Sequence, residues 1–399
     1  MNPNLTALQP YPFDQLNRLL DSVEPAKKPF ISLALGEPKH QPPGFILEAL
    51  NDRDLLTRGL ATYPPTKGLP ELRSAISQFI HRRFDPADAD PEHHVLPVNG
   101  TREALFAVAQ ALASPSERPL TLLPNPFYQI YEGAALLAGT QPRYMSCLVE
   151  NDFKPDIKNI SDDIWQQVGL VYLCNPGNPH GALLSIDELQ QWIGKVLEHD
   201  AILIVDECYS EIFRDEANPP AGLLEAAALM GNTSFKHCLT FNSLSKRSNL
   251  PGLRSGYVAG DADLLRQFLL YRTYHGSAMP VHSQIISSLA WSDEQHVIDN
   301  RAVYVKKTDD FIARLKPVWP IEPPKASFYL WPETPINDLD FTRALMRQCN
   351  IKTLPGQYLS RVADGINPGE NRVRLALVAD EAACQQAADR IVENFHALS

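Results

Sequence analysis

The stretch Ala201-Ile-Leu-Ile-Val-Asp-Glu-Cys-Tyr209 decides the fold of this chain. Five apolar residues in a row are typical of a sheet strand that is buried on both faces. Asp206 ends the run. A carboxylate in that position must be paired or neutralised. The stretch therefore predicts a buried strand with a polar site at its carboxyl end.

Further apolar runs lie on both sides of this stretch and alternate with helical patterns. Thr101 opens one amphipathic segment, and Ser185-Ile-Asp-Glu188 is a capping box before another. Strands that alternate with helices indicate βαβ units and a mostly parallel sheet, which is an α/β fold. Besides 201–205, the predicted strands are residues 94–98, 120–123, 170–174, 238–241 and 255–258.

The length of 399 residues is too great for one ordinary core, and the pattern predicts three parts. Residues 1–45 predict an N-terminal arm that joins the small domain. Residues 46–285 predict a large α/β domain, and residues 286–399 a smaller α+β domain. One helix from about 285 to 316 is expected to link the halves. The other small-domain elements predicted are strands 327–331 and 372–377 and helices 340–349 and 380–396.

Composition argues against several classes of function. The net charge is −11 without a basic block, which disfavours nucleic-acid binding. The six cysteines form no C-x-x-C pair, and there is no H-E-x-x-H pattern, so no disulfide framework and no metal site is indicated. No apolar run approaches the roughly 18 residues that span a membrane, and no secretory signal is visible. We expect a cytoplasmic protein with reduced thiols.

Polar residues follow nearly every predicted strand. Ligands of open parallel sheets bind outside the carboxyl ends of the strands, so these residues are expected to share one crevice. Taken singly, each could also be an ordinary turn. The segments are Asn99-Gly-Thr101, Pro124-Asn-Pro-Phe-Tyr128, Asn175-Pro-Gly-Asn-Pro179, Asp206-Glu207 and Ser243-Leu-Ser-Lys246.

The chemistry of these residues suits a phosphorylated ring. A desolvated lysine such as Lys246 becomes a nucleophile toward carbonyls. Arg254, near the serine hydroxyls and the helix start at Gly100-Thr101, suits a phosphate. Asp206 could pair with a protonated ring nitrogen. The plainer alternatives are a surface lysine and an aspartate that caps a turn.

In this order and spacing, the motifs resemble the fold-type I pyridoxal 5′-phosphate (PLP) aminotransferases of classes I and II. The motifs are Asn99-Gly-Thr101, Asn175-Pro-Gly-Asn-Pro-His-Gly181, Asp206-Glu-Cys-Tyr209, Ser243-Leu-Ser-Lys246 and Arg254-Ser-Gly256. The resemblance runs from about Leu33 to the C-terminus. It implies the PLP-transferase fold, PLP as cofactor, and amino-acid and 2-oxo-acid substrates.

The resemblance implies a role for each cofactor-site residue. Lys246 would hold PLP as a Schiff base and then shuttle the substrate proton. Asp206 would pair with the pyridine nitrogen, Asn178 and Tyr209 would donate to the phenolic oxygen, and Tyr128 would stack on the ring. The implied phosphate ligands are Gly100, Thr101, Ser243, Ser245 and Arg254, with Tyr63 reaching the site of a partner subunit in a homodimer.

The resemblance also implies a grip on the substrate α-carboxylate. Arg374, in Arg372-Val-Arg-Leu-Ala-Leu377, would bind it, with Asn175 orienting it and the Gly36 backbone beside it. If this segment is a strand, Arg372 faces the other side, so the two arginines cannot both serve.

Within this family, the N-terminal region and Gly36-Glu-Pro-Lys-His40 resemble bacterial succinyldiaminopimelate aminotransferases of lysine biosynthesis. That implies amino transfer between glutamate and N-succinyl-2-amino-6-oxopimelate. The alternatives are aminotransferases for aspartate, alanine or aromatic amino acids. Such a substrate needs a second cationic contact, for which Lys39, His40 and Arg372 are candidates by charge alone.

Rivals from other classes fit less well. Ser243-x-x-Lys246 also matches penicillin-binding hydrolases, which need a lysine-threonine-glycine strand that this sequence does not contain. A PLP-dependent C–S lyase would share the motifs, because the cofactor supplies the electron sink in both reactions. A ligand sensor fused to a DNA-binding module is disfavoured, since the fold is expected to begin near residue 35.

Overall fold

The computed structural model describes residues 3–398. Its centre is a seven-stranded sheet in the order β2-β8-β7-β6-β5-β3-β4, in which every neighbouring pair is parallel except the two that involve β8. This confirms the predicted α/β class with a mostly parallel sheet. The strands are β2 (Val95–Val98), β3 (Leu120–Asn125), β4 (Gln141–Ser146), β5 (Val168–Cys174), β6 (Ile202–Asp206), β7 (Cys238–Ser243) and β8 (Gly256–Gly260).

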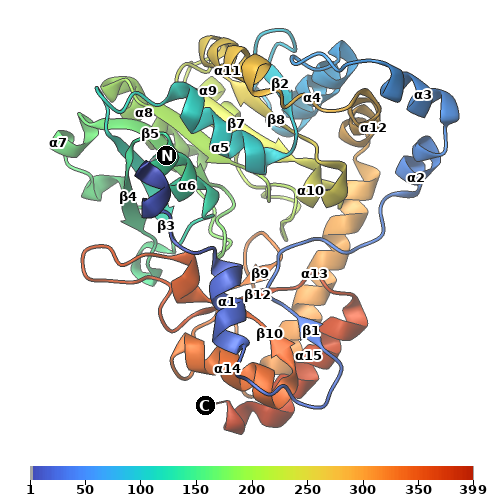
Figure 1. Cartoon of the computed structure of the whole chain (residues 1–399), viewed down its shortest axis with the longest axis vertical. Helices are drawn as coiled ribbons and strands as arrows, with labels where there is room; N and C mark the ends of the chain where they lie inside the picture. Colours follow the sequence, from blue (N-terminus) through green and yellow to red (C-terminus); the bar gives the residue numbers. More distant parts are fainter. Residues whose placement is uncertain (1–2, 399) are drawn as a thin grey trace.

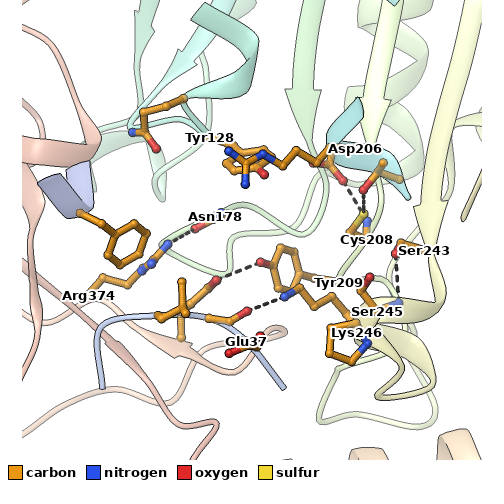
Figure 2. A pocket seen from close by; sticks show the side chains of 18 of the residues that line it. Glu37, Tyr128, Asn178, Asp206, Cys208, Tyr209, Ser243, Ser245, Lys246 and Arg374 are labelled. Carbon is orange, nitrogen blue, oxygen red and sulfur yellow. Dashed lines mark hydrogen bonds between the residues drawn. The ribbon is translucent and has the colours of Figure 1, made fainter. Parts of the chain in front are cut away.

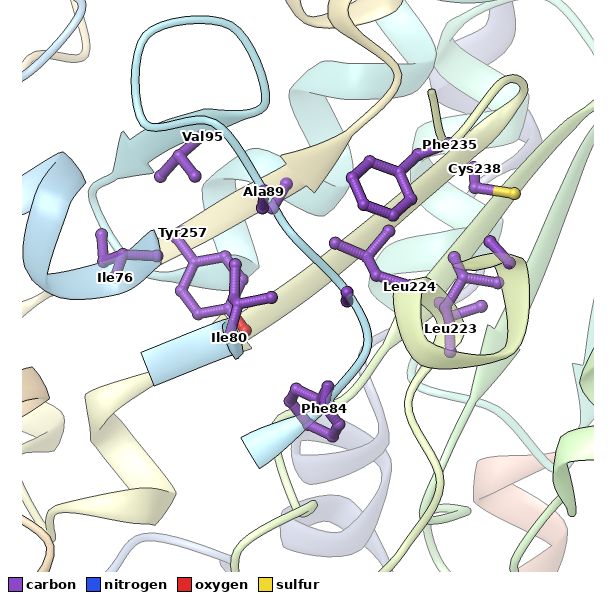
Figure 3. Packing of buried hydrophobic residues seen from close by; sticks show 14 of the residues in the cluster. Ile76, Ile80, Phe84, Ala89, Val95, Leu223, Leu224, Phe235, Cys238 and Tyr257 are labelled. Atoms are coloured by element: carbon purple, nitrogen blue, oxygen red, sulfur yellow. The ribbon is translucent and has the colours of Figure 1, made fainter. Parts of the chain in front are cut away.

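Helices cover both faces of this sheet, and β6 shows why its sequence is apolar throughout. Leu203 and Val205 lie in one hydrophobic cluster, whereas Ile204 between them lies in another on the opposite face. Figure 3 shows part of the first cluster, where side chains from α4, α9, β7 and β8 meet. The first cluster includes α4 (Pro70–Arg83), α8 (Ile186–His199), α9 (Leu223–Leu229) and α12 (Val281–Ser292); the second includes α5 (Thr101–Leu112), α6 (Ile130–Leu137) and α11 (Ala262–His275).

A second body of α+β structure lies beside the carboxyl ends of the sheet strands (Figure 1). It holds the antiparallel sheet β11-β12-β9 and the parallel pair β1-β10, through which Ile31 of the N-terminal segment pairs with Ile351. Its strands are β1 (Ile31–Ser32), β9 (Tyr329–Leu330), β10 (Ile351–Lys352), β11 (Leu354–Pro355) and β12 (Val373–Ala376), and its helices α1 (Pro12–Leu20), α13 (Gln295–Leu315), α14 (Asp338–Cys349) and α15 (Glu381–Asn394).

The structure departs from the prediction at one helix and at one strand of the large sheet. The single helix expected from 285 to 316 is two helices, α12 and α13, because Asp293 is extended and its side chain accepts from the N–H of His296, which starts a new helix. The edge strand β4 was missed, since its alternating exposure gives no apolar run. The remaining helices are α2 (Gly44–Leu50), α3 (Arg53–Ala61), α7 (Asp162–Trp165) and α10 (Leu244–Arg247).

The division into parts at residues 45 and 285 stays a prediction. Helix α12 packs on α3 and α4 beside the large sheet, whereas α13 packs on α15 in the second body. None of the helices within residues 3–398 has the length and apolar character needed to cross a membrane.

Candidate active site

A cavity of about 560 Å³ lies where the carboxyl edge of the large sheet faces the second body. The sheet contributes the ends of β6 and β7 and the loop after β5, and the second body contributes Tyr329 and Arg374. Most of the predicted site residues line this cavity, and Figure 2 shows several of them converging. Those that line it are Gly36, Thr101, Tyr128, Asn178, Asp206, Tyr209, Ser243, Ser245, Lys246, Arg254 and Arg374.

Lys246 points into this cavity from the short helix α10. Its Nζ donates to the carbonyl oxygen of Gly36 at 2.5 Å and lies over the rings of Tyr209 and Phe328, at 5.9 and 5.3 Å. Burial, with a smaller contribution from the charge of Arg374, lowers the pKa of Lys246 to about 8. A substantial fraction of the amine is therefore neutral near pH 8, as a nucleophile or a proton acceptor requires.

Asp206 is a buried carboxylate held by two donors. The hydroxyl of Tyr131 donates to Oδ2 at 2.7 Å, and the backbone N–H of Cys208 donates to Oδ1 at 3.1 Å. Burial raises the pKa of Asp206, while these two donors and the charge of Lys246 lower it. Tyr131 is itself fully buried and stacks on Tyr172, with ring centroids 5.0 Å apart. The carboxylate thus has a fixed direction, which suits pairing with a protonated ring nitrogen.

The phosphate cradle predicted from sequence is assembled around the start of α5. Gly100 precedes this helix with φ +78°, and a Cβ there would lie 2.4 Å from Nη2 of Arg254. Glycine is therefore needed for the guanidinium to lie against the helix start. Ser243 also accepts from the backbone N–H of Ser245 at 3.0 Å. Helix N–H groups, hydroxyls and one permanent cation together suit a phosphate dianion.

Arg374 on β12 lies on the opposite side of the cavity from this cradle (Figure 2). Its Nη2 donates to the carbonyl of Ala34 at 2.8 Å and its Nη1 to Oδ1 of Asn178 at 3.2 Å. The guanidinium lies over the ring of Tyr329, 4.3 Å from its centroid, and its Nε is buried with no hydrogen-bond partner among the described residues. A carboxylate is the natural ligand for such a guanidinium.

Gly36 is required at this place for a steric reason. A Cβ on Gly36 would lie 1.8 Å from the hydroxyl of Tyr329. That hydroxyl is also 3.0 Å from the hydroxyl of Tyr209, so the two tyrosines link the large sheet to the second body. Neither a larger residue at position 36 nor a shift of Tyr329 could be accommodated without disturbing Tyr209.

Asn175 does not have the position that its predicted role requires. It is fully buried, its Nδ2 donates to the carbonyl of Ala221 at 2.9 Å, and its Oδ1 accepts from the N–H of Leu184 at 2.9 Å. Both ends of the amide are thus bound within the protein, and Asn175 does not line the cavity. We correct the prediction: Asn178, three residues on, is the asparagine that meets Arg374.

Other predicted residues also lie outside this cavity. Tyr63 is 98% exposed and Gly100 lies behind Arg254. None of the three candidates for a distal contact lines it. His40 bonds Asn300 and faces a separate cavity, Arg372 bonds the carbonyl of Trp331, and Lys39 is exposed to solvent. A distal contact from any of these three residues to a ligand in this cavity is therefore not supported by the positions of their side chains.

The sequence analysis did not predict two tyrosines of the site or the contribution of the N-terminal arm to the cavity. Tyr131 is three residues after Tyr128, a spacing that could have placed both near Asp206. Tyr329 lies in the predicted strand 327–331 but belongs to none of the sequence motifs. Tyr11 and Phe13 also line the cavity, although nothing in their sequence context links them to it.

Comparisons with known proteins agree with this geometry. A family model described as aminotransferase class I and II matches residues 28–391. LL-diaminopimelate aminotransferase 2 of Trichormus variabilis is 29% identical over 391 residues, covering 97% of this chain and 96% of the relative. The putative aminotransferase AatC of Rhizobium meliloti is 30% identical, covering 96% and 93%.

Solved structures of high similarity include an aminotransferase of Neisseria meningitidis, with a TM-score of 0.93 and 46% identity over 98% of this chain and 99% of that one. Aminotransferase AspB of Helicobacter pylori has a TM-score of 0.88 and 38% identity, covering 97% and 98%.

Tyr131→Phe should weaken the binding of PLP by at least about 10-fold, because a hydrogen bond to a charged group contributes about 1.5–3 kcal/mol. Loss of the donor raises the pKa of Asp206 and so weakens its pairing with a protonated ring nitrogen. The measurement is equilibrium titration of the apo protein with PLP. Tyr144→Phe is the matched control, since that hydroxyl donates to Glu132, outside the cavity. Equal affinities in the two variants would refute the role of Tyr131.

Lys246 should capture PLP covalently at a rate that rises with pH and levels off above about 8, the pKa of its buried amine. An amine with the ordinary value of 10.5 would keep gaining reactivity well beyond that pH. Arg374→Gln should shift the profile to higher pH, because a neighbouring positive charge is lost. Borohydride reduction followed by mass spectrometry measures the linkage. Lys246→Ala should give no adduct; an adduct in that variant would show that another lysine is used.

Proposed function

The chain belongs to the class I and II aminotransferases, and from this we propose that it transfers an amino group between glutamate and N-succinyl-2-amino-6-oxopimelate, giving 2-oxoglutarate and N-succinyl-LL-diaminopimelate. The family and its fold depend on PLP. The observation that carries the proposal is the convergence of a buried lysine, a buried aspartate, a phosphate cradle and a carboxylate-binding arginine on one cavity.

The residues present fit PLP. Asp206 would bind the pyridine nitrogen, and Thr101, Ser243, Ser245 and Arg254 the phosphate, with Gly100 giving room for Arg254. When bound, PLP supplies the electron sink that stabilises negative charge on the substrate Cα. Tyr128 lines the cavity beside these groups and would pack on the ring face.

Lys246 would move the proton. As a free amine, its Nζ has a pKa of about 8, which lies close to the operating pH. Nζ would accept the proton that leaves the substrate Cα, hold it within the cavity and give it back later in the reaction. The carbonyl of Gly36, an acceptor for Nζ at 2.5 Å, would keep the amine within the cavity while it does so.

Arg374 and Asn178 would orient the substrate through its α-carboxylate. The guanidinium is already held by Ala34 and by the ring of Tyr329, so little side-chain entropy is lost on binding. The hydroxyl of Tyr209, which lies beside that of Tyr329, would donate to the phenolic oxygen of the cofactor together with Asn178. Substrate and cofactor would thus be bound by residues that contact one another.

Two features support a diaminopimelate skeleton as the substrate. The segment Gly36-Glu-Pro-Lys-His40 and the N-terminal region resemble succinyldiaminopimelate aminotransferases. Several curated relatives with 26–29% identity are named LL-diaminopimelate aminotransferases. LL-Diaminopimelate has the same carbon skeleton as the succinyl compound but carries a free distal amine. LL-Diaminopimelate is therefore the second candidate, and the similarity to the Helicobacter pylori AspB structure makes aspartate a third.

We also propose that the working form is a cytoplasmic homodimer that serves lysine biosynthesis. Tyr63 is almost fully exposed and is remote from the cavity of its own chain, as expected of a residue that completes the phosphate site of a second copy. Other large apolar side chains, including Leu60 and Tyr274, are exposed as well and would be covered in such a dimer.

A panel of amino donors tests the substrate directly. Glutamate and N-succinyl-LL-diaminopimelate should each convert the bound cofactor to its amino form, which is seen as loss of the visible absorption band. Without an oxo acid, each should react once per site. Reaction with LL-diaminopimelate or aspartate but not with the succinyl compound would refute the specific substrate and leave the aminotransferase class intact.

Arg374→Gln should raise KM for every amino acid in the panel by at least about 30-fold, because truncating one partner of a desolvated ion pair costs about 2–5 kcal/mol. All the substrates share the α-carboxylate. Arg372→Gln is the control, since Arg372 lies over Phe153 and outside the cavity. A substrate-selective effect of Arg374→Gln would instead place this arginine at the distal end.

A further inference from the structure

The catalytic cavity contains one cation that the reaction has not used. Four cationic side chains line it, Lys246, Arg254, Arg374 and Arg102. In the proposed function, Lys246 would bind the cofactor aldehyde, Arg254 its phosphate and Arg374 the substrate α-carboxylate. Arg102 has no assigned ligand. Arg102 is exposed on the first turn of α5. Within residues 3–398 it forms no ion pair and no hydrogen bond through its side chain.

The N-terminal arm supports Arg102. The guanidinium carbon of Arg102 lies 5.6 Å from the ring centroid of Tyr11. The centroids of the Tyr11 and Phe13 rings are 6.0 Å apart. Tyr11 and Phe13 both line the same cavity. A guanidinium placed over an aromatic face keeps its N–H edge free for an incoming anion.

Arg102 lines the same cavity as Tyr128, the residue expected on the face of the cofactor ring. Burial raises the pKa of Tyr128, and the charge of Arg102 opposes that rise. Tyr11 acts on Tyr128 as well. Tyr11, Arg102 and Tyr128 thus line one cavity from three elements, which are the N-terminal arm, the start of α5 and the segment before α6.

We propose that Arg102, supported by Tyr11, binds the distal carboxylate of the amino-acid substrate and so selects substrates that carry a second carboxylate. This inference rests on the proposed function. A substrate with more than one carboxylate leaves one anion unpaired after Arg374 is engaged, and a desolvated carboxylate without a partner is costly. Arg102 can form a bidentate pair with it.

The alternative role for Arg102 is a further phosphate ligand, because its neighbour Thr101 belongs to the cradle. The two roles differ in what is lost on substitution. A phosphate ligand would weaken PLP binding and affect every substrate alike. A distal-carboxylate ligand would leave PLP affinity unchanged and discriminate among substrates by charge.

The experiment compares Arg102→Gln with the parent protein in half-reactions with N-succinyl-LL-diaminopimelate, glutamate and uncharged norleucine. We expect the half-saturating concentration to rise about 3- to 5-fold for the carboxylate substrates, because an ion pair at an exposed position contributes up to about 1 kcal/mol. It should stay within about twofold for norleucine. PLP affinity should be unchanged, and Arg102→Lys should recover part of the loss. Arg343→Gln, which removes an exposed arginine paired with Asp340 on α14, is the matched control.

Tyr11 gives a second, independent test. Tyr11→Phe keeps the aromatic face and should behave like the parent, whereas Tyr11→Ala should weaken carboxylate substrates selectively, by less than Arg102→Gln does. This readout separates support of the guanidinium from any direct contact of the Tyr11 hydroxyl.

Three outcomes would overturn the inference: an equal effect on norleucine, a loss of PLP affinity in Arg102→Gln, or no change for any carboxylate substrate. Failure of the proposed function looks different. If N-succinyl-LL-diaminopimelate does not react but glutamate or aspartate does, the comparison with norleucine still tests Arg102. If the succinyl compound reacts equally well with parent and Arg102→Gln, the inference fails and the proposed function stands.

Discussion

The carboxylate of Asp206 lies at the end of a strand that is buried on both faces, and its charge determines what must surround it. Two donors, Tyr131 and the N–H of Cys208, hold its oxygens. Neither donor carries a positive charge. A buried carboxylate with only neutral donors is suited to a cationic ligand. In the proposed function, the protonated ring nitrogen of PLP would supply that cation and complete the electrostatic pairing.

The positions of Arg374 and Lys246 in the cavity depend on a short segment of the N-terminal arm. The carbonyl of Ala34 accepts from Arg374, and that of Gly36 accepts from Lys246. One stretch of backbone therefore holds both the substrate-binding cation and the reactive amine. Tyr329 lies against Gly36 and beneath Arg374, and its hydroxyl meets that of Tyr209. Through these contacts, Tyr329 joins Arg374, which is proposed to bind the substrate, to Tyr209, which is proposed to bind the cofactor.

The sheet and most of the cofactor side could be predicted because their signals are local. An apolar run that ends in Asp206, and a serine, lysine and arginine at fixed spacing, report burial and chemistry along one segment. Asn175 and Asn178 show the limit of such signals, because a repeated asparagine-proline pattern does not say which amide is consumed by the fold. Tyr329 has no local signal at all, since its role comes from packing between two bodies.

Arg102 is a further case in which sequence position conceals function. In the sequence, the residue after Thr101 is indistinguishable from an ordinary exposed arginine. Only the fold of the N-terminal arm places the ring of Tyr11 against its guanidinium. Tyr11 and Arg102 lie on the arm and on α5, whereas Asp206 ends β6 and Lys246 lies on α10. Substitutions in the arm or on the first turn of α5 can therefore change the electrostatics of the cavity edge while leaving the buried groups in place. A chain built in this way can keep one reaction and alter its substrate, because the group that chooses the substrate lies on a different part of the fold from the groups that carry out the chemistry.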